Sequence, residues 1–171
     1  MKPKDNSHKY FMNLALKEAK QALFAGEFPV GCVMVCDNQL VASGSRERSS
    51  GDCPNELDHA EMVTLRKLTN LKGFNAYSRV SVYCTMEPCL MCYAALILSG
   101  IRCIVWAYED VMGGGTQCDL NKLPPLYAGS RVSIIPYFCR QESLEIFKRF
   151  FSDANNGYWK GSLLAEYTLK Q

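Results

Sequence analysis

Three potential metal ligands, one histidine and two cysteines, occupy two short stretches of this chain. His59 begins the run His59-Ala60-Glu61, and Cys89 and Cys92 lie in the run Pro88-Cys89-Leu90-Met91-Cys92. A neutral imidazole and two thiolates form a nitrogen and sulfur ligand set that suits Zn²⁺. Because three protein ligands leave the fourth tetrahedral position open, the pattern predicts a catalytic zinc site rather than a purely structural one.

Glu61 follows the histidine by two residues, so its carboxylate lies close to the predicted metal without being a ligand. Zinc lowers the pKa of water, which supplies a nucleophile near neutral pH. We expect Glu61 to act as the general acid and base of a zinc-assisted hydrolysis. The alternative is a solvated carboxylate that only benefits from the dipole at a helix start.

Two further alternatives concern the metal ligands themselves. Cys89 and Cys92 could form a redox pair or belong to the core, and His59 could be an ordinary polar residue. The combination of all three with Glu61 favours the metal site. The only other histidine, His8, falls in a polar N-terminal segment, so we expect no histidine-rich site.

The elements that must position these residues can be read from the pattern around them. A helix is predicted from near Asp58 to about Leu68, with Asp58 or a neighbour as its cap. A second helix, from Cys89 to Leu98, begins after Pro88, and its N-terminus would favour the thiolate forms. Its first turn places the two cysteines on the same side.

The remaining pattern alternates helices with apolar strands, which predicts a three-layer α/β fold with a mixed sheet. The first two strands should form an antiparallel hairpin, and later strands run parallel through helical crossovers. Predicted strands cover residues 30–35, 40–43, 80–85, 101–108 and 132–136, and further helices cover residues 10–25, 141–151 and 159–169.

Composition limits the class of protein. The 171 residues are 48% hydrophobic and 21% charged, which predicts one domain over residues 1–171 with a helical extension at about 152–171. The net charge of +2 neither requires nor excludes a nucleic-acid partner.

The start of the chain lacks a secretory pattern, and no stretch looks able to span a membrane. We therefore expect a cytoplasmic protein whose nine cysteines are reduced. Cys32, Cys36, Cys84 and Cys103 are expected in the core.

Three stretches carry a family resemblance: Phe28-Pro29-Val30-Gly31-Cys32, His59-Ala60-Glu61-Met62 and the run from Tyr83 to Cys92. On these, the chain resembles the cytidine/deoxycytidylate deaminase superfamily, and within it the tRNA adenosine deaminases. The histidine, glutamate and paired cysteines match the signature of zinc-dependent nucleobase deaminases. The resemblance implies a three-layer α/β/α sandwich with a central mixed five-stranded sheet, one zinc ion per subunit and a homodimer.

The resemblance also implies which residues contact the substrate. Pro29, Val30 and Gly31 would line the base pocket, although an ordinary turn into a strand would explain the same residues. Ala60 and Pro88 flank the ligands, and the backbone N–H of Cys89 would help to orient the water or the base.

Two residues depart from the family pattern. Arg46 stands where the family usually carries an asparagine that touches the substrate, although Asn55 could replace that asparagine if the loop folds back. The family usually carries a small residue just before the histidine, where this chain has Asp58. Asp58 would either contact the substrate or cap the helix. We include both Arg46 and Asp58 among the candidate substrate-binding residues.

The C-terminal segment adds Tyr158, Trp159 and Tyr167. These aromatic residues could stack on a base, but we expect them to pack an extra helix onto the core or a second subunit. Arg140, Lys148 and Arg149 could contact phosphates or form a solvated surface.

The sequence therefore predicts hydrolytic deamination of a nucleobase, with adenosine in tRNA as the expected substrate. The alternatives are deamination of a free base or nucleoside (guanine, cytosine or a modified purine) and a non-catalytic zinc-binding partner subunit.

Overall fold

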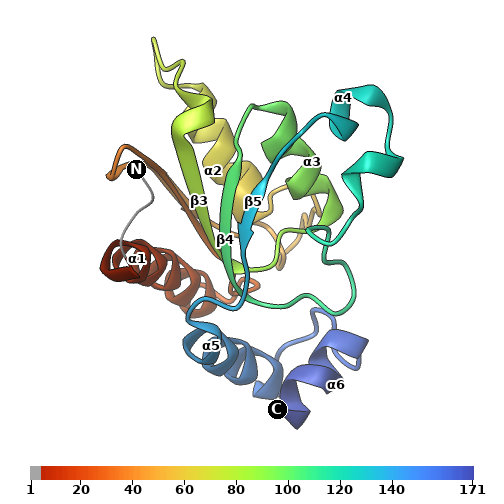
Figure 1. Cartoon of the computed structure of the whole chain (residues 1–171). Helices are drawn as coiled ribbons and strands as arrows, with labels where there is room; N and C mark the ends of the chain where they lie inside the picture. The colour runs from red at the N-terminus through yellow and green to blue at the C-terminus, as the bar shows by residue number, and fades with distance from the viewer. Residues whose placement is uncertain (1–4) are drawn as a thin grey trace.

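A five-stranded sheet forms the centre of the molecule in the computed structural model, which describes residues 5–171 (Figure 1). The order of the strands across the sheet is β2-β1-β3-β4-β5. β1 is antiparallel to β2 and β3, whereas β3, β4 and β5 run parallel to one another. The sheet is therefore mixed, as predicted. The strands are β1 (Gly31–Cys36), β2 (Gln39–Ser45), β3 (Val80–Met86), β4 (Cys103–Tyr108) and β5 (Ser133–Ile135).

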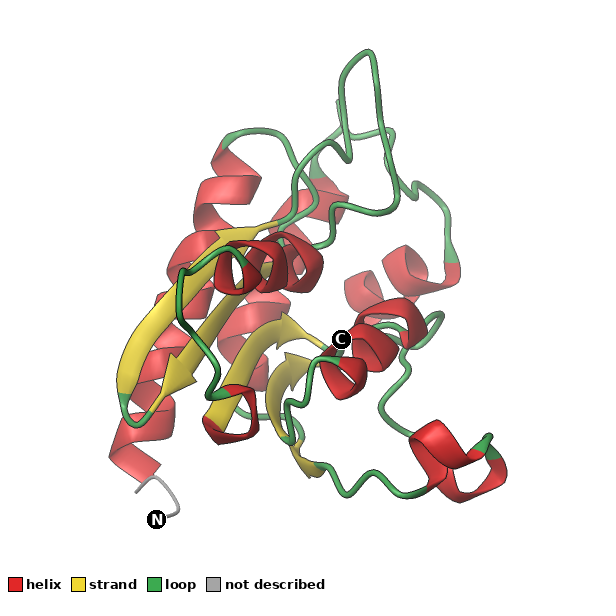
Figure 2. Ribbon diagram, turned by 90° about the horizontal axis from the view of Figure 1, so that it is seen from above, coloured by secondary structure: helices red, strands yellow, loops and turns green. Residues whose placement is uncertain are grey.

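Helices cover both faces of this sheet and complete the three layers (Figures 1 and 2). α1 packs on one face beside α5, while α2 and α3 cover the other face. The described residues also form one short helix and two 3-10 turns in the connecting loops, which the sequence pattern did not indicate. The longer helices are α1 (Asp5–Phe24), α2 (Ala60–Thr69), α3 (Leu90–Leu98), α5 (Arg140–Ser152) and α6 (Leu163–Lys170), and α4 (Pro125–Ala128) is a single turn.

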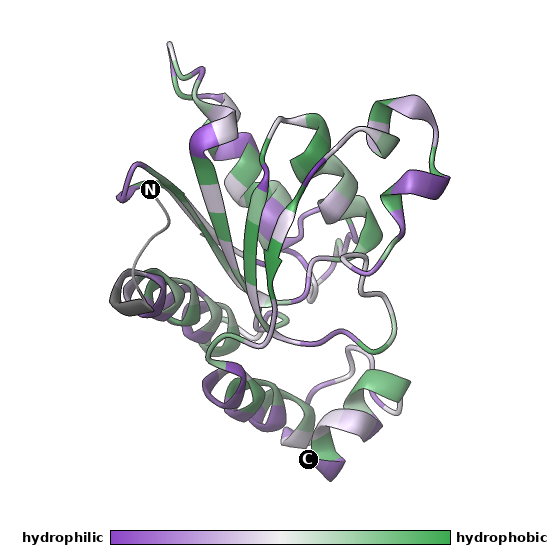
Figure 3. Ribbon diagram, in the orientation of Figure 1, coloured by the Kyte–Doolittle hydropathy of each residue, from purple (hydrophilic) through white to green (hydrophobic). Residues whose placement is uncertain are grey.

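Because helices lie on both sides, the central strands are buried on both faces. In β1, Val33 and Val35 belong to the cluster under α1, whereas Cys32 and Met34 belong to the cluster under α2. This explains why β1 is apolar throughout instead of alternating between apolar and polar residues. In Figure 3 the central strands are largely green, with paler bands between the apolar residues.

The first two strands form the predicted hairpin, and Asp37 and Asn38 both adopt positive φ angles at its turn. This conformation suits a tight two-residue hairpin, and Asn and Asp tolerate it better than most residues. The first helix begins earlier than predicted and includes His8. That residue is buried against the rings of Tyr83 and Phe138 rather than lying in a polar tail.

All nine cysteines are free, as expected for a reduced protein. Cys32, Cys36 and Cys84 are buried in the core as predicted, while Cys103 at the start of β4 is only partly buried. Among the helices of residues 5–171, none is both long and apolar enough to cross a bilayer. The prediction that no secretory signal begins the chain concerns residues 1–4, which lie outside the described part.

Candidate metal and catalytic site

The two predicted ligand runs meet because α2 and α3 begin at the same end of the sheet. His59 is the N-cap residue of α2, and Cys89 is the N-cap residue of α3. Both residues have extended backbone, with ψ angles of 150° and 170°, so each precedes the first helical turn without belonging to it. Cys92 follows one turn later in α3, on the same side as Cys89.

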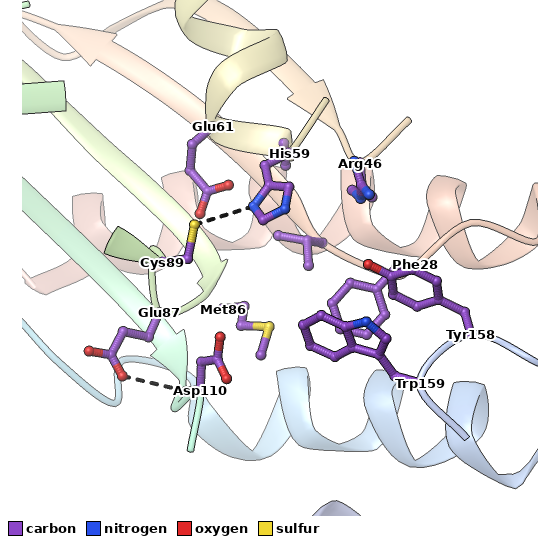
Figure 4. Close-up of a pocket in the computed structure, with 12 residues that line it drawn as sticks. Phe28, Arg46, His59, Glu61, Met86, Glu87, Cys89, Asp110, Tyr158 and Trp159 are labelled. Carbon is purple, nitrogen blue, oxygen red and sulfur yellow. Dashed lines mark hydrogen bonds between the residues drawn. The ribbon is translucent and has the colours of Figure 1, made fainter. Parts of the chain in front are cut away.

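The three ligand atoms have the spacing that a tetrahedral metal requires. The Nδ1 atom of His59 lies 3.5 Å from the Sγ atom of Cys89 and 3.6 Å from that of Cys92 (Figure 4). Ordinary Zn–N and Zn–S bond lengths at a tetrahedral angle separate nitrogen and sulfur by about 3.6 Å. Among the described residues these are the ones whose side chains group in this way. The residues therefore fit a zinc ion.

The electrostatics of the cysteines also suit a metal ligand set. A hydrogen bond from Cys92 and another with His59 lower the pKa of Cys89 to about 4. The same interaction with Cys89, together with burial, raises the pKa of Cys92. A thiolate is therefore favoured at Cys89, and thiolates are the form that binds zinc.

Glu61 lies in the first turn of α2 and points toward the ligand group (Figure 4). Its side chain is 3% exposed, and its Oε2 atom is 3.6 Å from the Sγ atom of Cys92. Burial raises the pKa of Glu61 above that of an ordinary glutamate. A carboxyl group with a raised pKa can both accept and donate a proton near neutral pH.

A second carboxylate, Glu87, supports the loop around the cysteines. It is buried, and its Oε1 atom accepts hydrogen bonds from the backbone N–H and hydroxyl of Thr116. Its Oε2 atom accepts a longer bond from the N–H of Asp110. Glu87 is therefore not a solvated surface carboxylate but helps to hold this loop in place.

A cavity that is open to solvent lies over the ligand residues. Of the seven candidate substrate-binding residues, Val30, Arg46 and Ala60 line it. Phe28, Met86, Glu87, Asp110, Tyr158 and Trp159 line it as well. Phe28 and Met86 belong to runs that the sequence had already marked, but nothing in the spacing of Asp110 indicated a place in the pocket.

The four other candidates do not line the cavity. Gly31 packs against α1 so closely that a Cβ atom would lie 2.1 Å from the carbonyl oxygen of Ala15. Its requirement for glycine therefore comes from helix packing. Pro29 leads into the same strand, and Pro88 precedes the N-cap of α3.

Asp58 neither lines the cavity nor caps α2, because the helix begins at Ala60 and no side chain caps it. The carboxylate is buried and accepts hydrogen bonds from Asn55, Arg48 and Arg66. These partners, Asn55 first, lower the pKa of Asp58 to about 2. Asp58 therefore holds the loop before α2 together, and Asn55 belongs to the same network rather than to the pocket.

Arg46 follows β2 and is almost fully buried, with 2% of its surface exposed. Its terminal nitrogens donate to the carbonyl oxygens of Glu47 and Asn55, at 3.1 and 2.6 Å. They also pair with the carboxylate of Glu56 at 3.2 Å. The buried Nε atom has no protein partner. Arg46 also lines the cavity, whereas its Nε atom is enclosed within the protein.

The family is shown by comparison with known sequences. The sequence pattern of the "cytidine and deoxycytidylate deaminase zinc-binding region" matches residues 5–108, which contain all three ligands and Glu61. The tRNA-specific adenosine deaminase of Aquifex aeolicus is 30% identical over 147 residues, covering 86% of this chain and 95% of that protein. The tRNA-specific adenosine deaminase 2 of Xenopus tropicalis is 32% identical over 155 residues, covering 85% and 89%.

Solved structures agree with this comparison. A structure from studies of A-to-I editing by tRNA:A34 deaminases aligns with a TM-score of 0.70 and 29% identity, covering 81% of this chain and 99% of the other. A guanine deaminase from Nitrosomonas europaea aligns with a TM-score of 0.61 and 18% identity, covering 82% of each chain. The second likeness shows the fold alone.

Proposed function

This chain belongs to the cytidine and deoxycytidylate deaminase family, and from that membership we propose that it converts adenosine to inosine in tRNA. The observation that carries the proposal is the juxtaposition of the ligand group His59, Cys89 and Cys92 with the carboxylate of Glu61 beside one cavity. The relatives that act on tRNA match this chain over most of their length.

The chemistry divides between the metal and the protein. Zinc held by the three ligands would lower the pKa of water and supply a nucleophile near neutral pH. Glu61 accepts one proton of the attacking water and delivers it to a ring nitrogen. It then takes the remaining proton of the added hydroxyl and passes it to the leaving amine. The N–H of Cys89 orients the reacting group. Addition at C6 of adenine followed by loss of ammonia gives inosine.

We propose that Val30, Arg46 and Ala60 contact the base or its sugar, since their side chains or backbone line the cavity. Pro29, Gly31 and Pro88 act on the pocket indirectly by shaping the strand and helix starts around it. A base in an anticodon loop is already unpaired, so moving it into the cavity costs less than extruding a base from a duplex.

We further propose one deaminase domain that works in the cytoplasm as a homodimer with one zinc ion per subunit. The apolar side chains of Leu90 and Leu98 on α3 and of Met112 in a following loop are exposed. A second copy of the chain could cover this surface. Light scattering after gel filtration gives the mass of the particle and so tests the dimer.

The function is tested with the purified, zinc-loaded protein on two sets of substrates. One is an anticodon stem-loop with adenosine at the wobble position, and the other is a panel of free bases and nucleosides that includes guanine and cytosine. We expect inosine to form in the stem-loop. Deamination of a free base alone would replace tRNA with a small molecule as substrate. No deamination at all, with zinc bound, would favour a non-catalytic subunit.

A further inference from the structure

The C-terminal segment reaches back to the cavity and forms part of its wall. Tyr158 and Trp159, together with Phe28, lie on the side away from Glu61 and Cys89 (Figure 4). From the sequence, packing was the expected role of the C-terminal aromatic residues and base stacking the alternative; a place in the cavity wall favours the alternative for Tyr158 and Trp159. Tyr167 follows that expectation, because it packs near Tyr108 and donates a hydrogen bond to Glu109.

The two aromatic rings of the wall are held in a fixed arrangement. The rings of Tyr158 and Trp159 stack with 5.3 Å between centroids and an interplanar angle of 8°. The hydroxyl of Tyr158 donates to the carboxylate of Glu56 at 2.9 Å, and Glu56 pairs with Arg46. The backbone N–H of Tyr158 donates to the side chain of Asn156, which fixes the turn before the pair.

The backbone of Trp159 has an unusual conformation for a bulky residue. Its φ angle is +53°, a left-handed conformation that bulky residues rarely adopt. This turn delays the predicted helix start, so α6 begins only after the cap at Ser162. Strained residues of this kind gather at binding sites, where the surrounding structure compensates for them.

Packing against the core covers only part of the surface of the Tyr158 and Trp159 rings. Both rings contact Phe28, with centroid distances of 5.3 and 5.6 Å, yet Tyr158 and Trp159 remain only partly buried. A flat aromatic surface that faces a zinc-ligand group across a cavity is suited to the π-face of a heterocyclic base.

We infer that Trp159, backed by Tyr158, is the surface on which the base being deaminated stacks. The inference rests on the proposed function only in requiring a nucleobase as substrate. It assigns the C-terminal segment, which lies beyond the matched family region of residues 5–108, to substrate binding. The segment thereby becomes part of the active site rather than an added packing element.

The test compares two substitutions at Trp159 with one in the same segment outside the cavity. Loss of one base-stacking contact reduces affinity by about 5- to 100-fold, so kcat/KM on the anticodon stem-loop should fall by that factor in Trp159→Leu. Trp159→Phe should retain most of the activity. The control is Tyr167→Leu, which loosens α6 without removing a cavity side chain, and its kcat/KM should stay within about twofold of wild type.

Tryptophan fluorescence distinguishes stacking from packing, because a residue that only packs would not change its emission when the stem-loop binds. The chain has two tryptophans, and Trp106 is buried in the core. In a Glu61→Gln background, stacking of the bound stem-loop should quench the emission of Trp159. The quenching should disappear in the same background with Trp159→Phe.

Two results would overturn the inference. The first is that the bound stem-loop leaves the emission of Trp159 unquenched. The second is that Tyr167→Leu lowers kcat/KM as much as Trp159→Leu does when the two variants lose the same amount of melting temperature. If the wild type deaminates only a free base, the tRNA proposal fails, and the same variants measured on that base decide the stacking role. If the wild type deaminates nothing, the quenching experiment decides it.

Discussion

Replacing Glu61 with glutamine separates the chemical role of this residue from any structural role. The amide keeps the shape of the side chain but can no longer accept a proton from water. Glu61 is 3% exposed and its one hydrogen bond in the structure is from the thiol of Cys92. The carboxylate is also outside the group of three metal ligands.

The expected size of the effect follows from these contacts. Positioned general acid–base catalysis typically contributes about 10²- to 10⁴-fold, which corresponds to about 3–5 kcal/mol of activation free energy. Although activity falls, the free energy of unfolding should stay the same or increase. Burying a carboxylate costs free energy that burying a neutral amide largely avoids, and Glu61→Gln leaves no buried charge without its partner.

The assay therefore measures three quantities on the same preparation: the deamination rate on the wobble stem-loop, the zinc content and the melting temperature. We expect the rate to fall by at least about 100-fold, with zinc content unchanged and the melting temperature equal or higher. A variant that keeps its rate within a few-fold of wild type would refute the role of Glu61 in proton transfer. Loss of zinc in parallel with activity would instead make Glu61 a part of the metal site.

Three other predictions concern the ligands, the packing of β1 and the response to acid. Cys92→Ala should leave the purified chain almost free of zinc by elemental analysis, because two ligands remain. Gly31→Ala should lower the free energy of unfolding by about 1–3 kcal/mol in a denaturant titration, because its Cβ atom would overlap the backbone of α1. Gly157→Ala, with nothing within 4 Å of the added atom, is its control and should be close to neutral. Burial acts to raise the pKa of Glu109, but hydrogen bonds from Arg140 and a neighbouring tyrosine outweigh it and leave the pKa lowered. This stabilisation is therefore complete above the unfolded pKa of about 4.3 and is lost as the pH falls through the folded value. Denaturation at pH 6 and pH 3 should show a smaller acid loss in Arg140→Met than in wild type, and equal losses would contradict the assignment.

Much of the fold was predictable because its signals are local. Strands buried on both faces appear as short apolar runs, and the hairpin turn at Asp37 and Asn38 has residues that tolerate positive φ. Helix boundaries were less accurate. The expected C-terminal helix starts later than predicted because Trp159 and Gly161 adopt left-handed conformations, which the apolar spacing does not report.

The pocket was predictable only in part, since its wall comes from segments far apart in the chain. Arg46 and Asp58 both drew attention as departures from the family pattern, yet their environments differ. Arg46 lines the cavity, whereas the carboxylate of Asp58 is enclosed by Arg48, Arg66 and Asn55. The fold of the loop decides whether Arg46 or Asp58 faces the cavity. The residue types alone do not determine this.

The sequence by itself indicated the class of reaction, because the residue types and their short spacing within each run are those of a zinc-binding deaminase. His59, Glu61, Cys89 and Cys92 carry this information within two short stretches. The tertiary structure decided what surrounds that chemistry. It brought Tyr158 and Trp159 to the cavity about 100 residues after His59 through the packing of α5, α6 and the turn between them, and such long-range packing leaves no periodic signal in the sequence.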